Sequence, residues 1–328
     1  MEEIKKILVV RNDRIGDLIL SLPALSSLRK GHPEAHIAIL VQPYSQDILY
    51  KNQDLDEIIL DEDQGILPLA RKISQKRFDV AVILYPSWRN GWVCALSGIP
   101  IRVGTGFKPV GLLFNQKVYI HRKECHEVDY CLKLAEKAGG TGKEKEIRLW
   151  IKEEERLYAK EMLKNLDESP IIGIHPGSGG SALNWPERHF SRLIELLQGK
   201  NVVITGSNEE ETSINRILGK HKANPLNLCG KTSLSQLIAL FSFYDLFIGP
   251  STGPMHIASG LGKPVIALFP PIKSQSPVKW GPLGEKNVVL MPEVECHQKR
   301  CSSGCKLYNC MERITPERVL EEVYSWIN

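Results

Sequence analysis

The stretch that decides the fold is residues 6–17, which read KILVVRNDRIGD. Five residues typical of a buried strand run into a short polar loop with one glycine, and the apolar residues 18–25 then begin a helix. A strand, a loop and a helix in this order are typical of the start of a doubly wound α/β domain, in which ligands bind beyond the carboxyl ends of the strands. The sequence therefore predicts a binding loop at residues 11–17.

This loop carries two carboxylates and two guanidinium groups within seven residues, which is more charge than a simple connection needs. Asp17 follows Gly16 at the mouth of the predicted helix and is the first candidate for chemistry. The alternative is that Asp13 or Asp17 only caps or charges the first helical turn. The loop by itself leaves both interpretations open.

Size and composition are those of an ordinary globular protein. The 328 residues suffice for two domains of about 150 residues each, and hydrophobic residues make up 42% of the chain and charged residues 24%. No apolar run approaches the roughly 20 residues that span a bilayer. The first residues lack the apolar core of a signal peptide. We therefore expect a cytoplasmic protein.

The net charge of +4 is mild. It permits an anionic substrate or peripheral contact with an anionic membrane surface. Runs of lysine and arginine with interleaved aromatic residues, which are typical of nucleic-acid-binding proteins, do not occur in the sequence. We therefore expect no nucleic-acid partner.

Four of the eight cysteines fall within fifteen residues near the C-terminus, namely Cys296, Cys301, Cys305 and Cys310. Four thiolates can hold a structural zinc ion in a tetrahedral site. The gaps between them are four, three and four residues, however, rather than the usual two. Paired or free thiols are therefore the alternative, and disulfides are rare in a reducing cytosol. We expect no catalytic role for this cluster.

Strands and helices alternate twice along the chain. In the first half we expect strands at 6–10, 36–41, 57–60, 80–84 and 101–103, and helices at 18–30, 46–51, 68–76 and 88–97. A charged helical stretch at 143–168 links the halves. In the second half we expect strands at 170–175, 201–205, 246–248 and 265–269, and helices at 186–197, up to 217, 234–241, 252–261 and 315–326.

Repeated strand–helix units imply parallel sheets with right-handed crossovers. We therefore predict two doubly wound domains of similar size that face one cleft. The first takes residues 1–152 and the second residues 153–328, with the option that the last helix packs back on the first domain.

Two loops of the second half are suited to bind an anion. Residues 175–181 read HPGSGGS, and the glycines around Ser178, Gly179 and Gly180 let backbone N–H groups approach a phosphate. Neither a Walker A motif nor a dinucleotide fingerprint is present. Plain flexibility of the loop is the alternative explanation.

The second loop, residues 249–256, reads GPSTGPMH. A strand ends, the hydroxyls of Ser251 and Thr252 follow, and a helix opens at Gly253, where free N–H groups could hold a diphosphate without a metal. His256 would lie close to that anion. Alternatively, a hydroxyl only caps the helix and His256 packs in the core. Further along, Lys273 follows another strand and could reach an anion.

Together these segments resemble glycosyltransferase family nine, the bacterial heptosyltransferases that build the lipopolysaccharide core. The resemblance covers nearly the whole chain, and its anchors are residues 11–17 with the helix around 23–25, residues 175–178 through 185–186, residues 251–256, and the Ile-Thr-Pro of 314–316. It implies a GT-B fold, two Rossmann-like domains with the nucleotide donor held mainly by the second. It also implies transfer of a heptose from ADP-heptose with inversion at the anomeric carbon.

The resemblance makes Asp17 the general base that deprotonates the acceptor hydroxyl. It implies that Ser178, Gly179, Thr252, Gly253 and His256 bind the nucleotide diphosphate, with no essential metal ion. Gly16, Gly180, Ser251 and Lys273 complete the substrate and donor site that we expect. Arg11 or Arg14 would hold Asp17 charged or engage an anionic acceptor. Arg89 and Lys108 are further candidates for acceptor binding, and the acceptor would be lipid-linked or a polysaccharide.

Two positions depart from the family pattern. Leu183 stands where many members have a phosphate-binding lysine, and Ser251 stands where many have an acidic residue. Lys273 or an arginine of the first domain could replace the missing cation. A sugar-nucleotide epimerase or hydrolase of the same fold, or a non-catalytic nucleotide-sugar binder, are the alternative functions.

Overall fold

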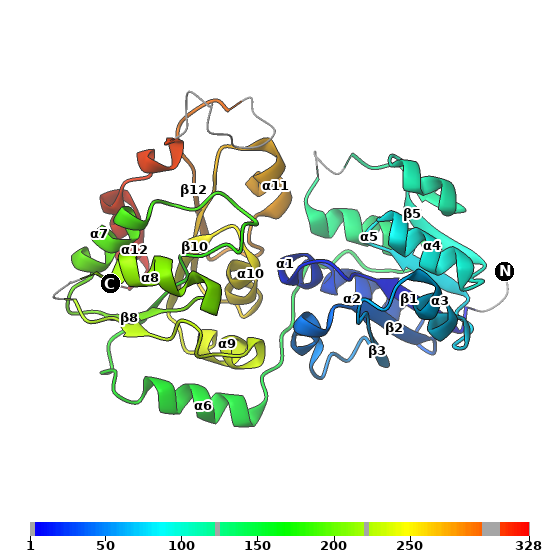
Figure 1. Ribbon diagram of the computed structural model, residues 1–328, viewed down its shortest axis with the longest axis horizontal. Coiled ribbons are helices and arrows are strands. Elements are labelled where there is room, and N and C mark those ends of the chain that lie inside the picture. Colours follow the sequence, from blue (N-terminus) through cyan, green and yellow to red (C-terminus); the bar gives the residue numbers. More distant parts are fainter. Residues whose placement is uncertain (1–3, 122–124, 220–222, 297–308, 328) are drawn as a thin grey trace. The chain divides into compact units, whose positions relative to one another are not determined.

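The structure is a computed structural model, and it describes residues 4–121, 125–219, 223–296 and 309–327. The chain forms two compact units, Met1–Trp150 and Ile151–Asn328 (Figure 1). Each unit holds a six-stranded sheet in which all strand pairs are parallel, in the orders β3-β2-β1-β4-β5-β6 and β12-β11-β10-β7-β8-β9. This is the Rossmann order, and its switch point lies between β1 and β4 in one unit and between β7 and β10 in the other.

The central strands β1, β2 and β4 of the first unit are apolar on both faces. The six strands of this sheet are β1 (Lys6–Val10), β2 (His36–Val41), β3 (Glu57–Leu60), β4 (Val80–Ile83), β5 (Ile101–Thr105) and β6 (Gln116–Val118). Val9 pairs with Ile39 on one side and Val82 on the other, and all three are fully buried. Continuous apolar strands of this kind are expected where helices cover both faces of a parallel sheet.

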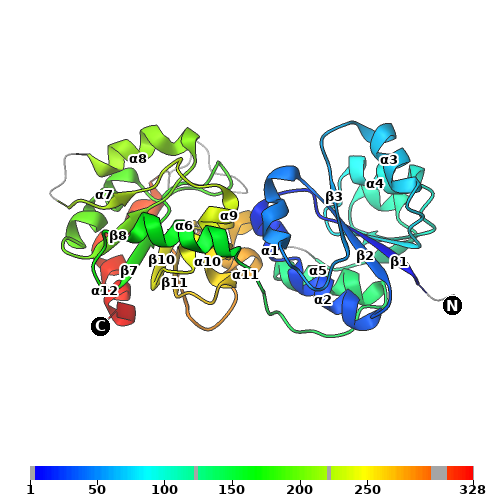
Figure 2. The ribbon, with the colours of Figure 1, turned by 90° about the horizontal axis from the view of Figure 1, so that it is seen from below.

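The helices of the first unit are α1 (Ile15–Ile19), α2 (Leu22–Gly31), α3 (Ile66–Ser74), α4 (Trp88–Leu96) and α5 (Glu127–Lys137), with 3₁₀ turns η1 (Pro43–Leu49) and η2 (Pro109–Leu113). Figure 2 shows α3 and α4 over one face of the sheet and α2 and α5 over the other. The carboxyl ends of the strands are thereby left to the loops that follow them.

The second unit repeats the arrangement. Its strands are β7 (Ile171–Ile174), β8 (Asn201–Ile204), β9 (Leu226–Asn227), β10 (Leu246–Pro250), β11 (Val265–Leu268) and β12 (Asn287–Leu290). Its helices are α6 (Glu153–Leu163), α7 (Glu187–Leu196), α8 (Glu211–Leu218), α9 (Leu234–Phe241), α10 (Gly253–Gly260), α11 (Pro277–Trp280) and α12 (Pro316–Ile327), with turns η3 (Asn208–Glu210), η4 (Lys273–Gln275) and η5 (Cys310–Arg313). Helix α12 packs on α7, β10 and β11, because Val319 and Val323 belong to this unit's core.

Three expectations from the sequence are wrong in detail. The single helix expected at 18–30 is two helices that meet at Leu20 and Ser21, because Pro23 can neither donate to the carbonyl of residue 19 nor fit against it. The segment expected as a helix at 46–51 is the 3₁₀ turn η1. Of the charged stretch 143–168, only α6 is helical.

Among the described residues, none of the helices combines the length and the apolar character needed to cross a bilayer.

Candidate active site

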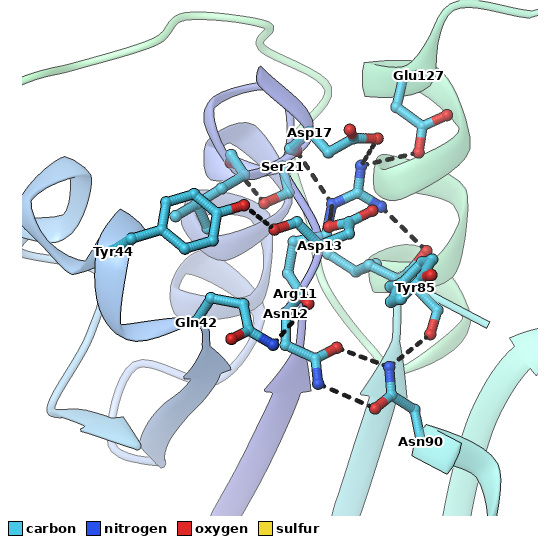
Figure 3. A network of polar contacts seen from close by, with 12 residues as sticks. Arg11, Asn12, Asp13, Asp17, Ser21, Gln42, Tyr44, Tyr85, Asn90 and Glu127 are labelled. Carbon is cyan, nitrogen blue, oxygen red and sulfur yellow. Dashed lines mark hydrogen bonds and ion pairs between the residues drawn. The ribbon is translucent and has the colours of Figure 1, made fainter. Parts of the chain in front are cut away.

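Arg11 organises the carboxyl edge of the first sheet, directly after β1. Its side chain is fully buried, and its Nη1 donates to the carbonyl of Leu84, which follows β4, at 3.1 Å. Its Nη2 donates to Asp17 Oδ1 at 2.9 Å and to Glu127 Oε1 at 3.0 Å. One guanidinium therefore joins β1, β4, α1 and α5 at the switch point of the sheet (Figure 3).

Three carboxyl groups surround this one guanidinium, since Asp13 Oδ1 also lies 3.2 Å from Arg11 Nε. Burial raises the pKa of Asp13 to about 7; Arg11 opposes this rise, and the charges of Asp17 and Glu127 add to it. Burial lowers the pKa of Arg11, but its acidic neighbours raise it more, so the guanidinium stays charged. Asp13 therefore changes its protonation state close to neutral pH.

Asp17 lies in the first turn of α1, and its side chain keeps 17% of its surface exposed. Arg11 Nε also donates to the backbone carbonyl of Asp17 at 3.0 Å, so both ends of this residue are held. The N-cap of α1 is Arg14, and no side chain caps the helix. Capping therefore does not explain the two aspartates, although a carboxylate at Asp17 still complements the helix N-terminus.

A second polar network lies beside the first. The side-chain amides of Asn12 and Asn90 bond reciprocally at 3.0 and 2.7 Å. Asn12 also donates to Asp61 at 2.5 Å, and Arg89 binds Asp61 through both nitrogens at 2.5 and 2.7 Å. Burial alone would raise the pKa of Asp61, but these donors lower it. The network links the loops that follow β1 and β3 to helix α4.

The four candidate acceptor residues occupy different surroundings. Arg11 is enclosed among carboxylates, which fits the role of holding Asp17 charged, whereas Arg14 is exposed beside it. Arg89 is engaged with Asp61. Lys108 is exposed ahead of η2. The loop after β1 therefore holds four of the predicted site residues, Arg11, Arg14, Gly16 and Asp17. Arg89 belongs to the adjoining network around Asp61.

In the second unit, His175 and Glu210 occupy the corresponding edge. His175 follows β7 and is buried; its Nδ1 lies 2.9 Å from Thr205 Oγ1 and its Nε2 lies 3.8 Å from Glu210. Burial lowers the pKa of His175 to about 4, against the opposing charge of Glu210. The Glu210 carboxylate accepts from the N–H groups of Gly179 at 3.1 Å and Ser207 at 3.0 Å. Loop N–H groups in this place already bind an anionic group.

The glycine-rich loop is an ordered turn. Ser181 N–H donates to the carbonyl of Ser178 at 2.9 Å, and Gly179 and Gly180 between them have φ of +51° and +73°. An added Cβ would meet nothing within 4 Å at either glycine, so the backbone conformation, not space, requires glycine here.

The segment that carries Lys273 lies against this loop. Gln275 of η4 accepts from the N–H of Leu183 at 3.1 Å and donates to the carbonyl of Ser181 at 3.5 Å. Lys273 itself is exposed. The turn that carries Lys273 therefore contacts the loop at Leu183, the position at which the lysine of the family pattern is missing.

The start of α10 lies at the switch point of the second sheet. β7 pairs with β10, and the N–H of His175 donates to the carbonyl of Ile248, so the loops after these strands are neighbours. Thr252 is the N-cap, but its hydroxyl donates to the carbonyl of Pro250 at 3.4 Å and does not accept from the helix. The first N–H groups of α10 are thus left without a side-chain cap. Gly253 opens this helix, and Ser251 precedes it.

His256 is buried in the first turn of α10, with 4% of its surface exposed. The helix start and the loop after β7 therefore bring five of the expected donor residues to one edge: Ser178, Gly179, Thr252, Gly253 and His256.

Trp185 explains why two distant anchors of the sequence pattern belong together. Its side chain is buried, and its indole Nε1 donates to the carbonyl of Ile314 at 2.8 Å. His189 lies 3.2 Å from the same carbonyl and packs edge-on against the indole ring. The Trp-Pro pair and the Ile-Thr-Pro segment therefore form one junction that joins the glycine-rich loop to the C-terminal helix.

Sequence reasoning missed Glu127, Asn12, Asp61 and Asn90 as site residues. Glu127 is fully buried although it is the first residue of α5, and its partner Arg11 lies 116 residues away. The signal that could have found it is an acidic residue opening an apolar helix, which is common on exposed helices as well.

The zinc hypothesis stays a prediction. Cys301 and Cys305 lie outside the described residues. In the part of the chain that the structure describes, no group of three or more His, Cys, Asp or Glu side chains is arranged to hold a metal ion. Cys310 is buried in η5.

Comparison with known proteins places this geometry in a family. The family model described as glycosyltransferase family 9 (heptosyltransferase) matches residues 66–309. Lipopolysaccharide heptosyltransferase 2 of Escherichia coli strain K12 is 28% identical over 341 residues, which cover 97% of each chain. The protein of the same name from Salmonella typhimurium is 28% identical over 346 residues, covering 98% of this chain and 99% of its own.

Solved structures agree with the fold. The E. coli ADP-heptose lps heptosyltransferase II superposes with a TM-score of 0.81 at 26% identity, over 98% of each chain. A glycosyl transferase family 9 protein from Veillonella parvula DSM 2008 gives a TM-score of 0.85 at 24% identity, over 100% of this chain and 98% of its own. These likenesses confirm the predicted α/β architecture, with two Rossmann-like sheets of the GT-B type.

Proposed function

Because the chain belongs to glycosyltransferase family 9, the heptosyltransferases, and is therefore a glycosyltransferase, we propose that it transfers a heptose from ADP-heptose to a lipopolysaccharide-core or related glycan acceptor. The named activity of the E. coli relatives supports this donor and this acceptor class. The observation that carries the mechanism is the partly exposed carboxylate of Asp17, which the fully buried Arg11 holds at the switch point.

In the proposed reaction, Asp17 accepts the proton of the acceptor hydroxyl as that oxygen attacks the anomeric carbon of the heptose. The bond from this carbon to the phosphate oxygen breaks, ADP leaves with the bonding electrons, and the configuration inverts. The Arg11 guanidinium at 2.9 Å favours the ionised carboxylate that a base requires. Arg11 is thus a positioning residue, and Arg14, Arg89 and Lys108 remain the candidates for acceptor contact.

The second unit is the proposed donor side, and the first unit is the acceptor side. The start of α10, which no side chain caps, offers backbone N–H groups to the diphosphate. In the turn at 178–181, the N–H of Gly179 binds Glu210 in this structure, so a diphosphate would take the place of that carboxylate. Such preorganised donors stabilise the charge that develops on the leaving ADP without a divalent ion. The proposed donor residues of this unit are Ser178, Gly179, Gly180, Ser251, Thr252, Gly253, His256 and Lys273, and Gly16 beside Asp17 is proposed to contact substrate.

The lipid-linked acceptor class further suggests where the enzyme acts. We propose a cytoplasmic protein that works at the inner face of the inner membrane through peripheral contact.

We also propose a structural zinc ion at the C-terminal cysteines. Metal analysis of the purified protein tests this proposal.

The decisive experiment compares Asp17→Asn with Asp63→Asn, which neutralises an exposed carboxylate in the loop after β3. We expect the turnover of Asp17→Asn to fall by about 10²- to 10⁴-fold, the usual contribution of a general base. Binding of ADP-heptose, measured by calorimetry, should stay within a few-fold of wild type, and Asp63→Asn should behave as wild type in both assays.

If Asp17→Asn retains full transfer activity, Asp17 is not the general base. Asp17 lies outside residues 66–309, the range that the family model matches, so this experiment tests a role that the match does not cover. Product analysis in the same assay separates the other functions: free heptose or an epimerised nucleotide sugar would indicate a hydrolase or epimerase. Donor binding without turnover on any acceptor would indicate a binding protein.

A further inference from the structure

The outer side of α4 exposes three large apolar side chains in one stripe. Trp88 is 51% exposed, Trp92 45% and Leu96 52%, and their spacing of four residues places them on one side of the helix. The opposite side is buried and comprises Asn90, Gly91, Val93 and Cys94. The helix therefore packs on its sheet through a different face, and the stripe stays exposed on its outer side.

The elements that pack against α4 also expose large apolar side chains. On α3, Leu67 is 60% exposed, and on η2, Leu112 is 81% exposed. The hydroxyl of Ser97, at the end of α4, bonds to the carbonyl of Ala70 on α3 at 3.1 Å, and α4 also packs against η2. We call these five side chains, Leu67, Trp88, Trp92, Leu96 and Leu112, the α4 face.

The segment that contains the α4 face is strongly basic. Residues 65–119 include eight lysines and arginines, and Asp79 is their only acidic residue, so the segment carries +7 in a chain whose total is +4. The basic residues are Arg71, Lys72, Lys76, Arg77, Arg89, Arg102, Lys108 and Lys117. Lys76 and Arg89 are paired with carboxylates outside the segment. Arg71 and Lys72 are exposed on α3, the helix that carries Leu67.

We propose that the α4 face is the surface through which this enzyme docks on an anionic lipid bilayer. Tryptophan favours the membrane interface, and apolar side chains combined with lysine and arginine are the composition of interfacial helices. Stacking on sugars would explain the two tryptophans but not the leucines, which have no aromatic face. The surplus of positive charge selects anionic headgroups.

The proposal rests on the proposed function through the lipid-linked acceptor, and the fold connects the two. Asn90 on the buried side of α4 bonds to Asn12, which is next to Arg11 in the base-bearing loop, and Arg89 of the same helix holds Asp61. The helix that would lie on the membrane is thereby attached to the loop that carries Asp17.

The test is flotation of the full-length protein with vesicles of phosphatidylcholine and phosphatidylglycerol, and with phosphatidylcholine alone. We expect binding to the anionic vesicles that weakens as salt increases. The double variant Trp88→Ser/Trp92→Ser and the single variant Leu112→Lys should each reduce partitioning, the former at least tenfold. The control Leu157→Ser/Val278→Ser alters equally exposed apolar residues of the second unit and should bind as wild type.

Circular dichroism and thermal melts establish whether the variants are folded. If the double tryptophan variant does not fold, Leu112→Lys still tests the α4 face. Equal binding of wild type and variants, or no binding of wild type, would overturn the proposal. Loss of transfer to a soluble, lipid-free acceptor in the tryptophan variant would point to sugar stacking and would also overturn it. A change of oligomeric state in the variants would assign the face to a second copy of the chain. Transfer to a soluble acceptor by the wild-type protein tests the proposed function without a membrane. The proposed function and the docking surface can therefore fail independently.

Discussion

At the scale of single residues, the first unit depends on one buried cation. Arg11 is the partner of Asp13, Asp17 and Glu127, and its side chain has no exposed surface. Removing one partner of a buried ion pair usually costs about 3–5 kcal/mol, since the other charge is left uncompensated. We expect Arg11→Met to lose this much unfolding free energy in urea titrations. Arg14→Met removes an exposed neighbouring guanidinium and should change stability by less than about 0.5 kcal/mol; equal losses would contradict this account.

Asp13 makes stability depend on pH in a defined direction. Its folded pKa of about 7 lies above the value of about 3.9 in an unfolded chain. Between these two values the folded protein binds more protons than the unfolded one, so wild-type stability falls as pH rises. Asparagine does not titrate in this range. The unfolding free energy of Asp13→Asn relative to wild type should therefore increase from pH 4 to pH 7, by up to about 1.4 kcal/mol per pH unit. Urea unfolding at pH 5, 6, 7 and 8 measures it, and a constant difference would contradict it.

At the scale of elements, the strands were the most predictable part. Runs such as residues 6–10 and 36–41 are apolar without interruption because both faces of a parallel sheet are covered, and the observed bounds of β1 and β2 are the predicted ones. The edge strands β6, β9 and β12 were not predicted. Strands β6 and β9 carry little apolar signal, and β12 is a run of only four residues. The break between α1 and α2 was not predicted, because the apolar periodicity of residues 18–30 indicates one helix whereas Pro23 indicates a new helix start.

The junction of the glycine-rich loop with the C-terminal segment gives an element-scale prediction. Trp185→Phe keeps the ring but leaves the buried carbonyl of Ile314 with only His189 nearby, which should cost about 1–3 kcal/mol in chemical denaturation. Trp280→Phe removes a comparable bond, from the indole to the carbonyl of Ser274 at 3.0 Å, at a more exposed place. We expect it to cost less than half as much, and equal effects would mean that the buried carbonyl of Ile314 is not the cause.

At the scale of the whole molecule, nucleotide binding should stabilise the protein selectively. The proposed donor site uses backbone N–H groups and a helix start, so ADP should raise the melting temperature in EDTA as well as in magnesium. At a hundredfold excess over its dissociation constant, a ligand adds about 2.7 kcal/mol to the folded state. UDP, GDP and CMP should add clearly less. A shift that requires magnesium, or one equal for all four nucleotides, would contradict the donor assignment.

The same scale shows what sequence alone could find of the site. Asp17, the turn at 178–181 and the start of α10 follow strands directly, so their position at the carboxyl edges could be derived from local pattern. Glu127 and Asp61 could not, because their roles come from partners in distant segments, Arg11 and Arg89. Local patterns locate the loops, whereas the charge balance within them depends on tertiary contacts.

The distance in sequence between Arg11 and Glu127 also sets an order in time. A ribosome adds about 5–20 residues per second, so Glu127 emerges roughly 6 to 23 seconds after Arg11. By then every strand of the first sheet has been synthesised, since β6 ends at Val118. A nascent chain halted before residue 127 would therefore contain the complete sheet and still lack Glu127, one of the three carboxyl groups around the buried Arg11. We expect the loop of residues 11–17 to be the last part of the first unit to take its final conformation during synthesis.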